Sequence, residues 1–346
     1  MAPEPVVSDQ GADRVVQRDI RLPRSIRRAA DGSVEQDLSL AALSAAARAG
    51  DGVLWVDVDA TQRSQHAVLE KIFGFHPLAL EDTLNPESRV KLEEYDGYLF
   101  TIVRGVRFNE QTDDPYDFQT LNLCFFLGGH YLVTVHGESS TVCAEVWDRV
   151  TRSPDLLDRG VARLQHAIMD AAIDAYFPIL DQVDEFIEGL EEELFNGGPA
   201  SDMRNVFSVK RLVLSLRRHL GPQREIFQIL ANRPQRLVPV DVQLYYRDIY
   251  DHVLRINDAF EMQRDMLSST LETHLSKASH QLGQVSKGLT LVATLSIPFV
   301  VVSGMWGMNF ERIPLSHSPA GFWVMLVAQV ALAAVLVGLL RFFRWL

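Results

Sequence analysis

The sequence predicts an α+β membrane protein, in which a mixed domain of strands and helices is followed by one long helix and two membrane-spanning helices. Three observations predict this class: alternating segments before residue 140, a stretch from 240 to 297 without proline, and two uncharged apolar runs near the C-terminus. The chain has 346 residues, 47% of them hydrophobic and 23% charged, and a net charge of −12. This composition excludes a wholly disordered chain, and the negative charge argues against a broad nucleic-acid-binding surface.

Residues 1–50 are expected to form a variable N-terminal segment, with a helix over the alanine-rich stretch from Leu40 to Ala49. The N-terminus lacks a basic region followed by an apolar core, so we expect no secretory signal. Residues 51–160 are expected to form an α/β domain, because strand patterns occur there together with a helical pattern at Gln65–Ile72.

Four segments of this domain carry strand patterns. Val53–Asp59 alternates apolar and acidic side chains, as a half-buried strand does, and Tyr98–Phe108 alternates more loosely. Leu121–Leu127 and His130–Val135 flank the pair Gly128-Gly129. Because glycine reaches positive φ freely, this pair predicts a two-residue hairpin turn between antiparallel strands.

Residues 161–238 are expected to form a helical hairpin, because an acidic helical stretch is followed by a break at 196–199 and then by a basic stretch. The charges could pair across the seam and concentrate cations, or they could be solvated faces over apolar stripes, and both interpretations stay open. The acidic residues are Asp170, Asp174, Asp181, Asp184, Glu185, Glu188, Glu191, Glu192 and Glu193, and the basic ones are Arg204, Lys210, Arg211, Arg217, Arg218 and Arg224.

Residues 239–287 predict a single stalk helix that continues into the first apolar run. No proline interrupts residues 240–297, and large apolar residues recur at intervals near three and four. About 65 helical residues extend about 100 Å. An apolar stripe on such a helix needs neighbours, which copies of the same chain supply most simply.

The two apolar runs, at 288–306 and 321–340, are each long enough to cross a bilayer as a helix. The alternative is a pair of buried helices in a water-soluble protein. Lys287 precedes the first run and a basic tail at 341–346 follows the second, so the positive-inside bias puts both chain ends in the cytoplasm. The loop at 307–320 then faces outside.

The chain carries no nucleotide-binding, metalloprotease or nucleophile-elbow motif, so its sequence favours no enzyme. The two cysteines, Cys124 and Cys143, are too few for a disulfide scaffold and lack the spacing of a zinc site. We therefore expect neither a disulfide framework nor a structural metal bound to sulfur.

The candidate for ion chemistry is Gly307-Met308-Asn309, directly after the first membrane helix. The last carbonyls of a helix lack donors and carry the negative end of its dipole. Gly307 lets the backbone leave the helix, and Asn309 adds an uncharged amide oxygen. Repeated by symmetry, these oxygens form a ring that suits Mg²⁺ with its water shell. The alternative is a glycine that only caps the helix, with asparagine tolerated in the left-handed region.

Further motifs accompany this triplet in the order and spacing of one family. They are His76-Pro77-Leu78-Ala79-Leu80-Glu81-Asp82, Arg89 through Tyr98, Tyr246-Arg247-Asp248-Ile249-Tyr250-Asp251-His252, Arg264-Asp265, Leu291–Pro298 and Gly307-Met308-Asn309-Phe310-Glu311. On these residues the sequence resembles the CorA family of magnesium and cobalt channels. The resemblance extends from about Val53 to the C-terminus and is strongest after Tyr245.

The resemblance implies a homopentamer with a cytoplasmic α/β funnel, a stalk helix that becomes the pore-lining membrane helix, and a second membrane helix outside it. Gly307, Met308 and Asn309 would form the outer selectivity filter for a hydrated cation, with Glu311 in the outer loop. Seven residues would face the pore axis, namely Gly304, Val300, Ile297, Leu289, Ser286, Gly283 and Glu272.

The resemblance also implies that Asp82 and Asp248 bind regulatory Mg²⁺ between neighbouring subunits. A divalent ion between carboxylates of two subunits offsets their repulsion, so its loss would let the subunits move apart. From the residues alone, Asp82 could instead be an acid at a helix N-terminus, and Asp248 an exposed i,i+4 partner. Arg341 and Arg344 would belong to a basic collar around the cytoplasmic neck.

The sequence departs from the family pattern in the outer loop and near the expected gate. Trp306 stands where tyrosine is usual, and the stretch from Arg312 lacks an acid that the family commonly has there. Gly283 stands where asparagine is common, and Ser286 where a large apolar gate residue is common. Leu289 is then the remaining candidate for a constriction that closes by dewetting.

We therefore predict an inner-membrane channel, a homopentamer in the lipid bilayer, that passes Mg²⁺ and also Co²⁺ and Ni²⁺. Cytoplasmic Mg²⁺ would close it, and no nucleic-acid partner is expected. Two alternatives stay open: a zinc transporter of the same superfamily, and a membrane-anchored Mg²⁺ sensor that conducts nothing. Met308 in the filter triplet and the presence of Asp248 favour the magnesium branch.

Overall fold

The structure is a computed structural model that describes residues 22–109, 112, 116–137, 140–196, 203–308 and 318–342. The chain divides into two compact units, one that ends at Leu267 and one that begins at Ser268.

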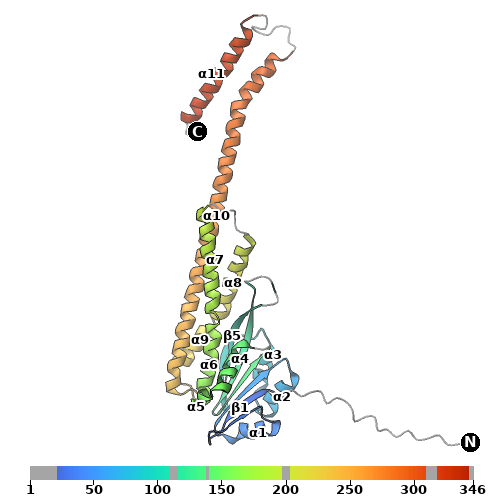
Figure 1. The fold of residues 1–346 in the computed structure, drawn as a ribbon, viewed down its shortest axis with the longest axis vertical. Coiled ribbons are helices and arrows are strands. Elements are labelled where there is room, and N and C mark those ends of the chain that lie inside the picture. The colour runs from blue at the N-terminus through green and yellow to red at the C-terminus, as the bar shows by residue number, and fades with distance from the viewer. Residues whose placement is uncertain are drawn as a thin grey trace, which may run out of the picture. The chain divides into compact units, whose positions relative to one another are not determined.

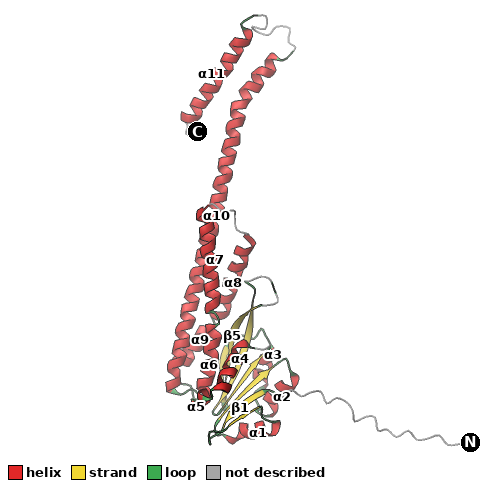
Figure 2. Cartoon of the chain, viewed as in Figure 1, coloured by secondary structure: helices red, strands yellow, loops and turns green. Residues whose placement is uncertain are grey.

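The first unit contains a seven-stranded mixed sheet, drawn in yellow in Figure 2, with strand order β2-β1-β3-β7-β6-β5-β4. The strands are β1 (Arg24–Arg28), β2 (Val34–Gln36), β3 (Val53–Asp59), β4 (Lys91–Tyr95), β5 (Tyr98–Phe108), β6 (Phe118–Gly128) and β7 (Tyr131–His136). Only β3 and β7 pair in parallel, and the other described neighbours are antiparallel. The predicted ranges of β3 and β5 are confirmed.

The prediction that β3 is half-buried, with one face toward solvent, is wrong. This strand lies inside the sheet between β1 and β7, and helices cover both of its faces, so its side chains are buried in both directions. Trp55 packs against the ring of Trp147, while Leu54 and Val56 belong to the core on the opposite face. Asp57, which alternation places on a solvent-facing side, is buried.

The hairpin between β6 and β7 is confirmed, but the predicted turn geometry is wrong. Leu127 pairs with Leu132, and neither Gly128 nor Gly129, both of which the structure describes, has a positive φ. A Cβ on Gly128 would overlap the ring of Tyr131. The turn therefore needs this glycine for space rather than for a left-handed backbone.

Strands β1 and β2 lie within residues 1–50, the variable segment for which the sequence indicates only the helix at Leu40–Ala49. The segment RSIRR of β1 carries one large apolar side chain, Ile26, so its alternation is not visible, yet it pairs with β3 along its whole length. Ser25 holds the segment that follows β2, because its Oγ accepts a hydrogen bond from the amide of Leu38 at 2.8 Å. The helix predicted over Leu40–Ala49 is confirmed as α1, which begins after the capping side chain of Ser39.

Helices cover the sheet on both faces (Figure 1). On one face lie α1, α2 (Arg63–Lys71) and α3 (Pro77–Leu84). On the other face lie α4 (Thr141–Arg152), α5 (Asp155–Asp158) and α6 (Val161–Asp174), and the core continues from there into the remaining helices of the unit. Those helices are α7 (Phe177–Asn196), α8 (Met203–Leu220), α9 (Gln223–Asn232) and the first part of α10 (Val240–Trp306).

The range predicted as one helical hairpin, 161–238, contains the four helices α6 to α9. Most of its acidic residues lie on α7 and most of its basic residues on α8, and both of these helices contact α10. Among the side chains that the structure describes in α7 (177–192) and α8 (205–220), no ion pair joins the two helices. Instead, Arg217 of α8 pairs with Glu261 of α10 at 3.1 Å. The amide of Gln263 on α10 donates to Asp184 of α7 at 2.8 Å. Polar contacts of both hairpin helices are therefore directed to the long helix.

The second unit consists of the end of α10 and the helix α11 (Gly321–Phe342). Both helices contain windows long and apolar enough to cross a membrane, and 0% and 6% of those windows are buried inside the structure. Core helices of a water-soluble protein would instead be mostly buried. The exposed apolar side chains therefore argue against the alternative of two buried core helices.

Candidate functional site

The described part of the filter triplet lies directly after the last turn of α10. The amide of Gly307 still donates to the carbonyl of Ser303 at 3.0 Å, and the amide of Met308 donates to that of Met305 at 3.4 Å. Gly307 has no positive φ, so it is not a left-handed helix cap, but a Cβ there would lie 3.3 Å from the Ser303 carbonyl oxygen. Asn309 lies outside the described residues, as do Glu311 and Arg344.

The seven residues predicted to face a pore all lie on α10 and are all exposed: Glu272, Gly283, Ser286, Leu289, Ile297, Val300 and Gly304. The apolar members stand out, because Leu289 is 71% exposed, Ile297 58% and Val300 69%. An apolar helix face that nothing in the described part of the chain covers needs either lipid or other copies of the chain.

A different face of α10 is turned toward α11. Its residues are partly buried and recur at helical spacing: Leu291, Leu295, Pro298, Val302 and Trp306. The two helices are joined by a polar contact, in which the amide of Gln329 on α11 donates to the Ser303 hydroxyl at 3.3 Å. The face that packs within the chain and the face predicted to line a pore are therefore distinct.

Arg341 lies in the last turn of α11, where a cation interacts favourably with the helix dipole. It is exposed and close to the end of the second apolar run. This place agrees with a basic flank at one membrane surface.

Asp82 lies in the last turn of α3, so the alternative of an acid at a helix N-terminus is wrong. Its Oδ2 accepts an ion-paired hydrogen bond from Lys91 Nζ at 2.6 Å, and its Oδ1 accepts one from the Ser88 hydroxyl at 3.0 Å. Lys91 also contacts Glu93 at 3.0 Å. Within one chain, the Asp82 carboxylate is therefore already neutralised by an ammonium group.

Asp248 belongs to a cluster with Asp170 of α6 and His252 of α10. One ligand atom from each of the three lies within 4.8 Å of the others. Asp174 adds a second carboxylate, whose Oδ1 lies 3.3 Å from His252 Nδ1. Asp82 is not a member of this group of ligand atoms, so the structure of one chain does not bring the two predicted regulatory acids together.

Asp170 is the member of the cluster whose charged form is disfavoured by its surroundings. Burial raises the pKa of its carboxyl, and the neighbouring charge of Asp174 raises it further. Its Oδ1 is buried and has no hydrogen-bond partner among the residues that the structure describes. A buried carboxylate oxygen without a donor is costly, and a divalent cation would satisfy it.

Sequence reasoning missed Asp170, Asp174 and His252 as members of this site. The two aspartates and Asp248 belong to helices far apart in the chain, and no spacing rule connects such positions. His252 stands at i,i+4 from Asp248, which was the available signal, because residues four apart share one helix face.

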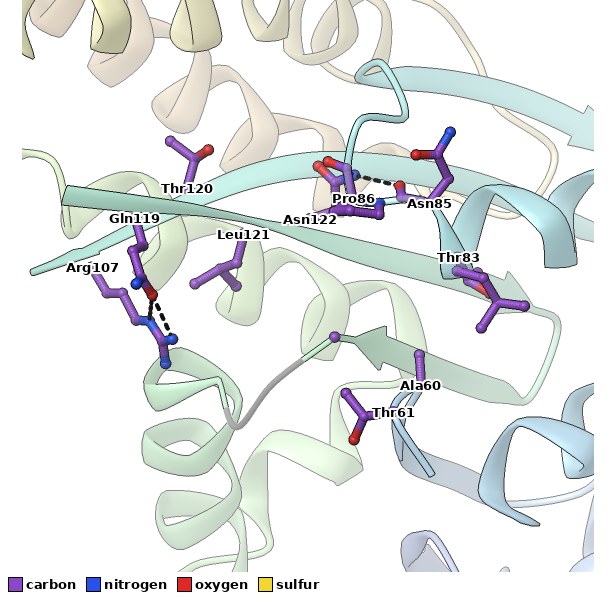
Figure 3. Close-up of a pocket in the computed structure, with 12 residues that line it drawn as sticks. Ala60, Thr61, Thr83, Asn85, Pro86, Arg107, Gln119, Thr120, Leu121 and Asn122 are labelled. Atoms are coloured by element: carbon purple, nitrogen blue, oxygen red, sulfur yellow. Dashed lines mark hydrogen bonds between the residues drawn. The ribbon is translucent and has the colours of Figure 1, made fainter. Parts of the chain in front are cut away.

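The structure also has a cavity of about 550 Å³ beside the sheet (Figure 3). The Asn122 amide donates to the Pro86 carbonyl at 3.1 Å, and Arg107 donates to Gln119 at 2.7 Å. The residues that line it are Ala60, Thr61, Thr83, Leu84, Asn85, Pro86, Arg107, Gln119, Thr120, Leu121, Asn122 and Gly137. None of these is acidic, so the cavity offers no carboxylate to a divalent cation.

Comparison with known proteins decides the family. A model of the family "CorA-like Mg2+ transporter protein" matches residues 50–341. The chain belongs to this family. It is 28% identical over 296 residues to the cobalt/magnesium transport protein CorA of Thermotoga maritima, covering 84% of this chain and 83% of that protein. It is 22% identical to the protein of the same name in Methanocaldococcus jannaschii, covering 85% of this chain and 92% of that protein.

The fold agrees with the family. The complete structure of the CorA magnesium transporter from Methanocaldococcus jannaschii superposes with a TM-score of 0.78, at 20% identity, over 93% of this chain and 98% of that one. The predicted fold class and family are thereby confirmed. This CorA-family chain is a transporter of divalent cations in a membrane, not an enzyme.

Proposed function

We propose that five copies of this chain form an inner-membrane channel that passes Mg²⁺, and also Co²⁺ and Ni²⁺, along a pore lined by α10. The observation that carries the proposal is the exposed face of α10, uncharged at its predicted pore-facing positions from Gly283 to Gly304, which leads to Gly307 and Met308 at its end. Two helices alone cannot enclose an aqueous path, so the pore needs several copies. The pentamer follows the family resemblance.

The proposed pore suits an ion that keeps its water. From Leu289 to Gly304 the pore-facing positions offer no charged ligand, and Mg²⁺ gives up its hydration shell reluctantly. The carbonyl end of α10 and the amide oxygen of Asn309 would then hydrogen-bond to hydration water rather than replace it. Such weak, outer contacts recognise the cation and still release it.

Leu289 is proposed as the gate. Its side chain is among the most exposed on α10 and belongs to the same helix face as Ile297 and Val300. A ring of leucine side chains excludes water when it narrows, and a hydrated ion cannot cross a dry constriction without losing its shell.

Two acidic sites are proposed to sense cytoplasmic Mg²⁺. At the first, Asp248, Asp170 and His252 offer a carboxylate-rich set in which one buried oxygen has no partner, which fits a cation. At the second, Asp82 would exchange its Lys91 partner for an ion shared with a neighbouring subunit. Bound Mg²⁺ would offset the repulsion between carboxylates and hold the closed arrangement, and its release would favour opening.

The proposal places both chain ends in the cytoplasm. Lys287 precedes the first apolar window, and Arg341 lies in the last turn of the second helix, so both basic flanks lie on the same side of the membrane. The first unit, which holds the proposed sensing residues, then faces the cytoplasmic Mg²⁺ pool.

Uptake into proteoliposomes tests the channel. Purified protein is reconstituted around a Mg²⁺-sensitive dye, and external Mg²⁺, Co²⁺, Ni²⁺ or Zn²⁺ is added under a negative internal potential. We expect Mg²⁺ uptake by the parent and little by Asn309→Ala. Equal uptake by both would refute the filter assignment, Zn²⁺ uptake alone would favour the zinc transporter, and no uptake by the parent would favour the sensor that conducts nothing.

A second pair of variants tests regulation separately from conduction. Asp248→Asn should keep uptake but require a severalfold higher internal Mg²⁺ concentration for closure. Asp251→Asn, three residues later on the same helix, is exposed and lies outside the cluster, so the same change in charge should leave closure unaltered. Identical closure in both variants would contradict the sensing role of Asp248.

A further inference from the structure

A second cluster of ligand-type side chains lies inside the sheet domain, away from the residues of the proposed channel. Asp57 of β3, His136 of β7 and Cys143 of α4 place one ligand atom each within 4.8 Å of the others. All three are more than nine-tenths buried, with exposed fractions of 8%, 7% and 1%. We propose that this cluster binds one transition-metal ion of the Zn²⁺ and Co²⁺ class.

The fold brings the three residues together from one parallel strand pair and one helix. β3 and β7 run parallel, with Asp57 opposite Thr134 and Asp59 opposite His136. Because side chains alternate along a strand, Asp57, Thr134 and His136 all point to the face that α4 covers. Cys143 lies in the first turn of α4, where its amide donates to the capping hydroxyl of Ser140 at 3.2 Å.

The spacing of Asp57 and His136 matches two ligands of one ion better than a direct hydrogen bond. His136 Nε2 lies 3.4 Å from both carboxylate oxygens of Asp57, whereas a charged N–H to carboxylate hydrogen bond is about 2.7–2.9 Å long. With bonds of about 2.0–2.1 Å, two tetrahedral ligands lie about 3.3 Å apart. An ion between the groups would therefore require little movement of either one.

Neighbouring groups already hold the Asp57 ligand in place. The Thr134 hydroxyl donates to Asp57 Oδ1 at 2.5 Å, and the indole N–H of Trp55 donates to the Thr134 hydroxyl oxygen at 3.1 Å. Hydrogen bonds of this kind orient metal ligands and tune their basicity. The other carboxylate oxygen of Asp57, Oδ2, lies 3.4 Å from His136 Nε2.

The donor set selects the class of metal. A thiolate and an imidazole suit Zn²⁺ and Co²⁺, whereas Mg²⁺ prefers oxygen ligands and keeps most of its water. A tetrahedral ion with three protein ligands leaves its fourth position for a water molecule. The site therefore differs in chemistry from the acidic cluster around Asp248 and from the filter, and it does not depend on the proposed channel function.

The charges of the three groups would balance those of a divalent ion. The ion would stabilise the Cys143 thiolate directly, because a thiolate rather than a thiol is the metal ligand. Binding then releases the thiol proton to water and leaves a neutral set of one carboxylate, one thiolate, one imidazole and the ion.

Cobalt spectroscopy on the purified full-length protein tests the site. Co²⁺ bound to a thiolate gives a ligand-to-metal charge-transfer band in the near ultraviolet, whereas Co²⁺ bound only to oxygen or nitrogen does not. The titration is carried out in detergent with millimolar Mg²⁺ present, so that Mg²⁺ competes for the oxygen sites. We expect the band to saturate at one Co²⁺ per chain and to disappear when Zn²⁺ is added.

The second cysteine supplies a matched control. Cys124 is also buried, on β6, but belongs to the core on the opposite face of the sheet and to neither candidate metal cluster among the described residues. Cys124→Ser should keep the band, and Cys143→Ser should lose it while retaining the circular dichroism of the parent. His136→Gln should keep the sulfur ligand but raise the Kd for Co²⁺ by at least about tenfold.

Three results would overturn the proposal. They are the absence of a charge-transfer band in the parent, loss of the band in Cys124→Ser but not in Cys143→Ser, and unchanged Co²⁺ affinity in His136→Gln. The parent protein and Cys124→Ser decide the question even where Cys143→Ser does not fold, because the chain has only two cysteines.

Discussion

His166 is predicted to make the stability of the first unit depend on pH. It lies on α6, next to the cluster around Asp248, and only 4% of it is exposed. Its Nε2 donates to the Tyr245 carbonyl at 3.1 Å, and its Nδ1 accepts from the Arg163 guanidinium at 2.8 Å. Because a guanidinium only donates and a carbonyl only accepts, this arrangement requires a neutral ring.

The magnitude follows from the shift in pKa. Burial, and then the charge of Arg163, lowers the pKa of His166 from 6.5 to about 4. A lowered folded-state pKa means that the unfolded chain binds the proton more tightly, so stability is complete above the unfolded pKa and is lost as pH falls from 6.5 toward 4. At about 1.4 kcal/mol per unit, the loss at about pH 4 is about 3 kcal/mol.

His166→Gln tests this reasoning, because glutamine offers one acceptor and one donor but does not titrate. Unfolding of the full chain in detergent is followed by circular dichroism at about pH 7 and about pH 4. The parent should lose about 3 kcal/mol more than the variant between the two pH values. His280→Gln, at an exposed position of α10, is the control and should behave like the parent. An equal loss in the parent and His166→Gln would refute the assignment.

Three further changes are expected to have measurable effects. Lys91→Gln removes the ammonium group from Asp82, so closure of the channel in proteoliposomes should require about fivefold less internal Mg²⁺. An unchanged Mg²⁺ requirement would count against the exchange of Lys91 for Mg²⁺ at Asp82. Tyr246→Phe deletes the buried hydroxyl that donates to Gln165 at 2.8 Å, which should lower the free energy of unfolding by about 1–3 kcal/mol in denaturant titrations; a smaller change would show that the amide finds another donor. Gly307→Ala places a Cβ 3.3 Å from a carbonyl oxygen of the preceding turn and should slow Mg²⁺ uptake by about tenfold or more, whereas parental uptake would show that the helix end adapts.

Elements with a strong local pattern could be predicted from the sequence. Strands β3 and β5 have the predicted bounds because large apolar side chains recur along them, and α1 begins and ends at residues that cap helices. The two apolar runs likewise needed no tertiary information, since length and lack of charge define a membrane-spanning helix.

Elements that depend on a distant partner could not be predicted. β1 and β4 are rich in charged residues, and their strand conformation comes from pairing with β3 and β5. The burial of Asp57 was missed for a related reason, because an acid in an alternating strand normally faces water. Here the parallel neighbour β7 supplies the Thr134 hydroxyl, whose hydrogen bond stabilises the buried carboxyl.

The candidate sites also differ in whether the sequence alone can predict them. The filter triplet is continuous in sequence, so its position after the membrane helix is visible without a structure. The clusters around Asp248 and Asp57 each join residues from separate elements, and only the packing of those elements brings the ligand atoms within reach. Distances within a cluster are a property of the fold, which residue spacing does not encode.

The two outermost strands of the sheet limit how copies of this chain can associate. β2 is only three residues long, and β4 presents Lys91, Glu93 and Glu94 along an edge near α9. Unpaired backbone groups on a long, flat, uncharged border would invite a strand from another molecule, and these two borders are short or charged. We therefore expect protomers to meet through helical surfaces, so that assembly proceeds without the risk of open-ended polymerisation through joined sheets.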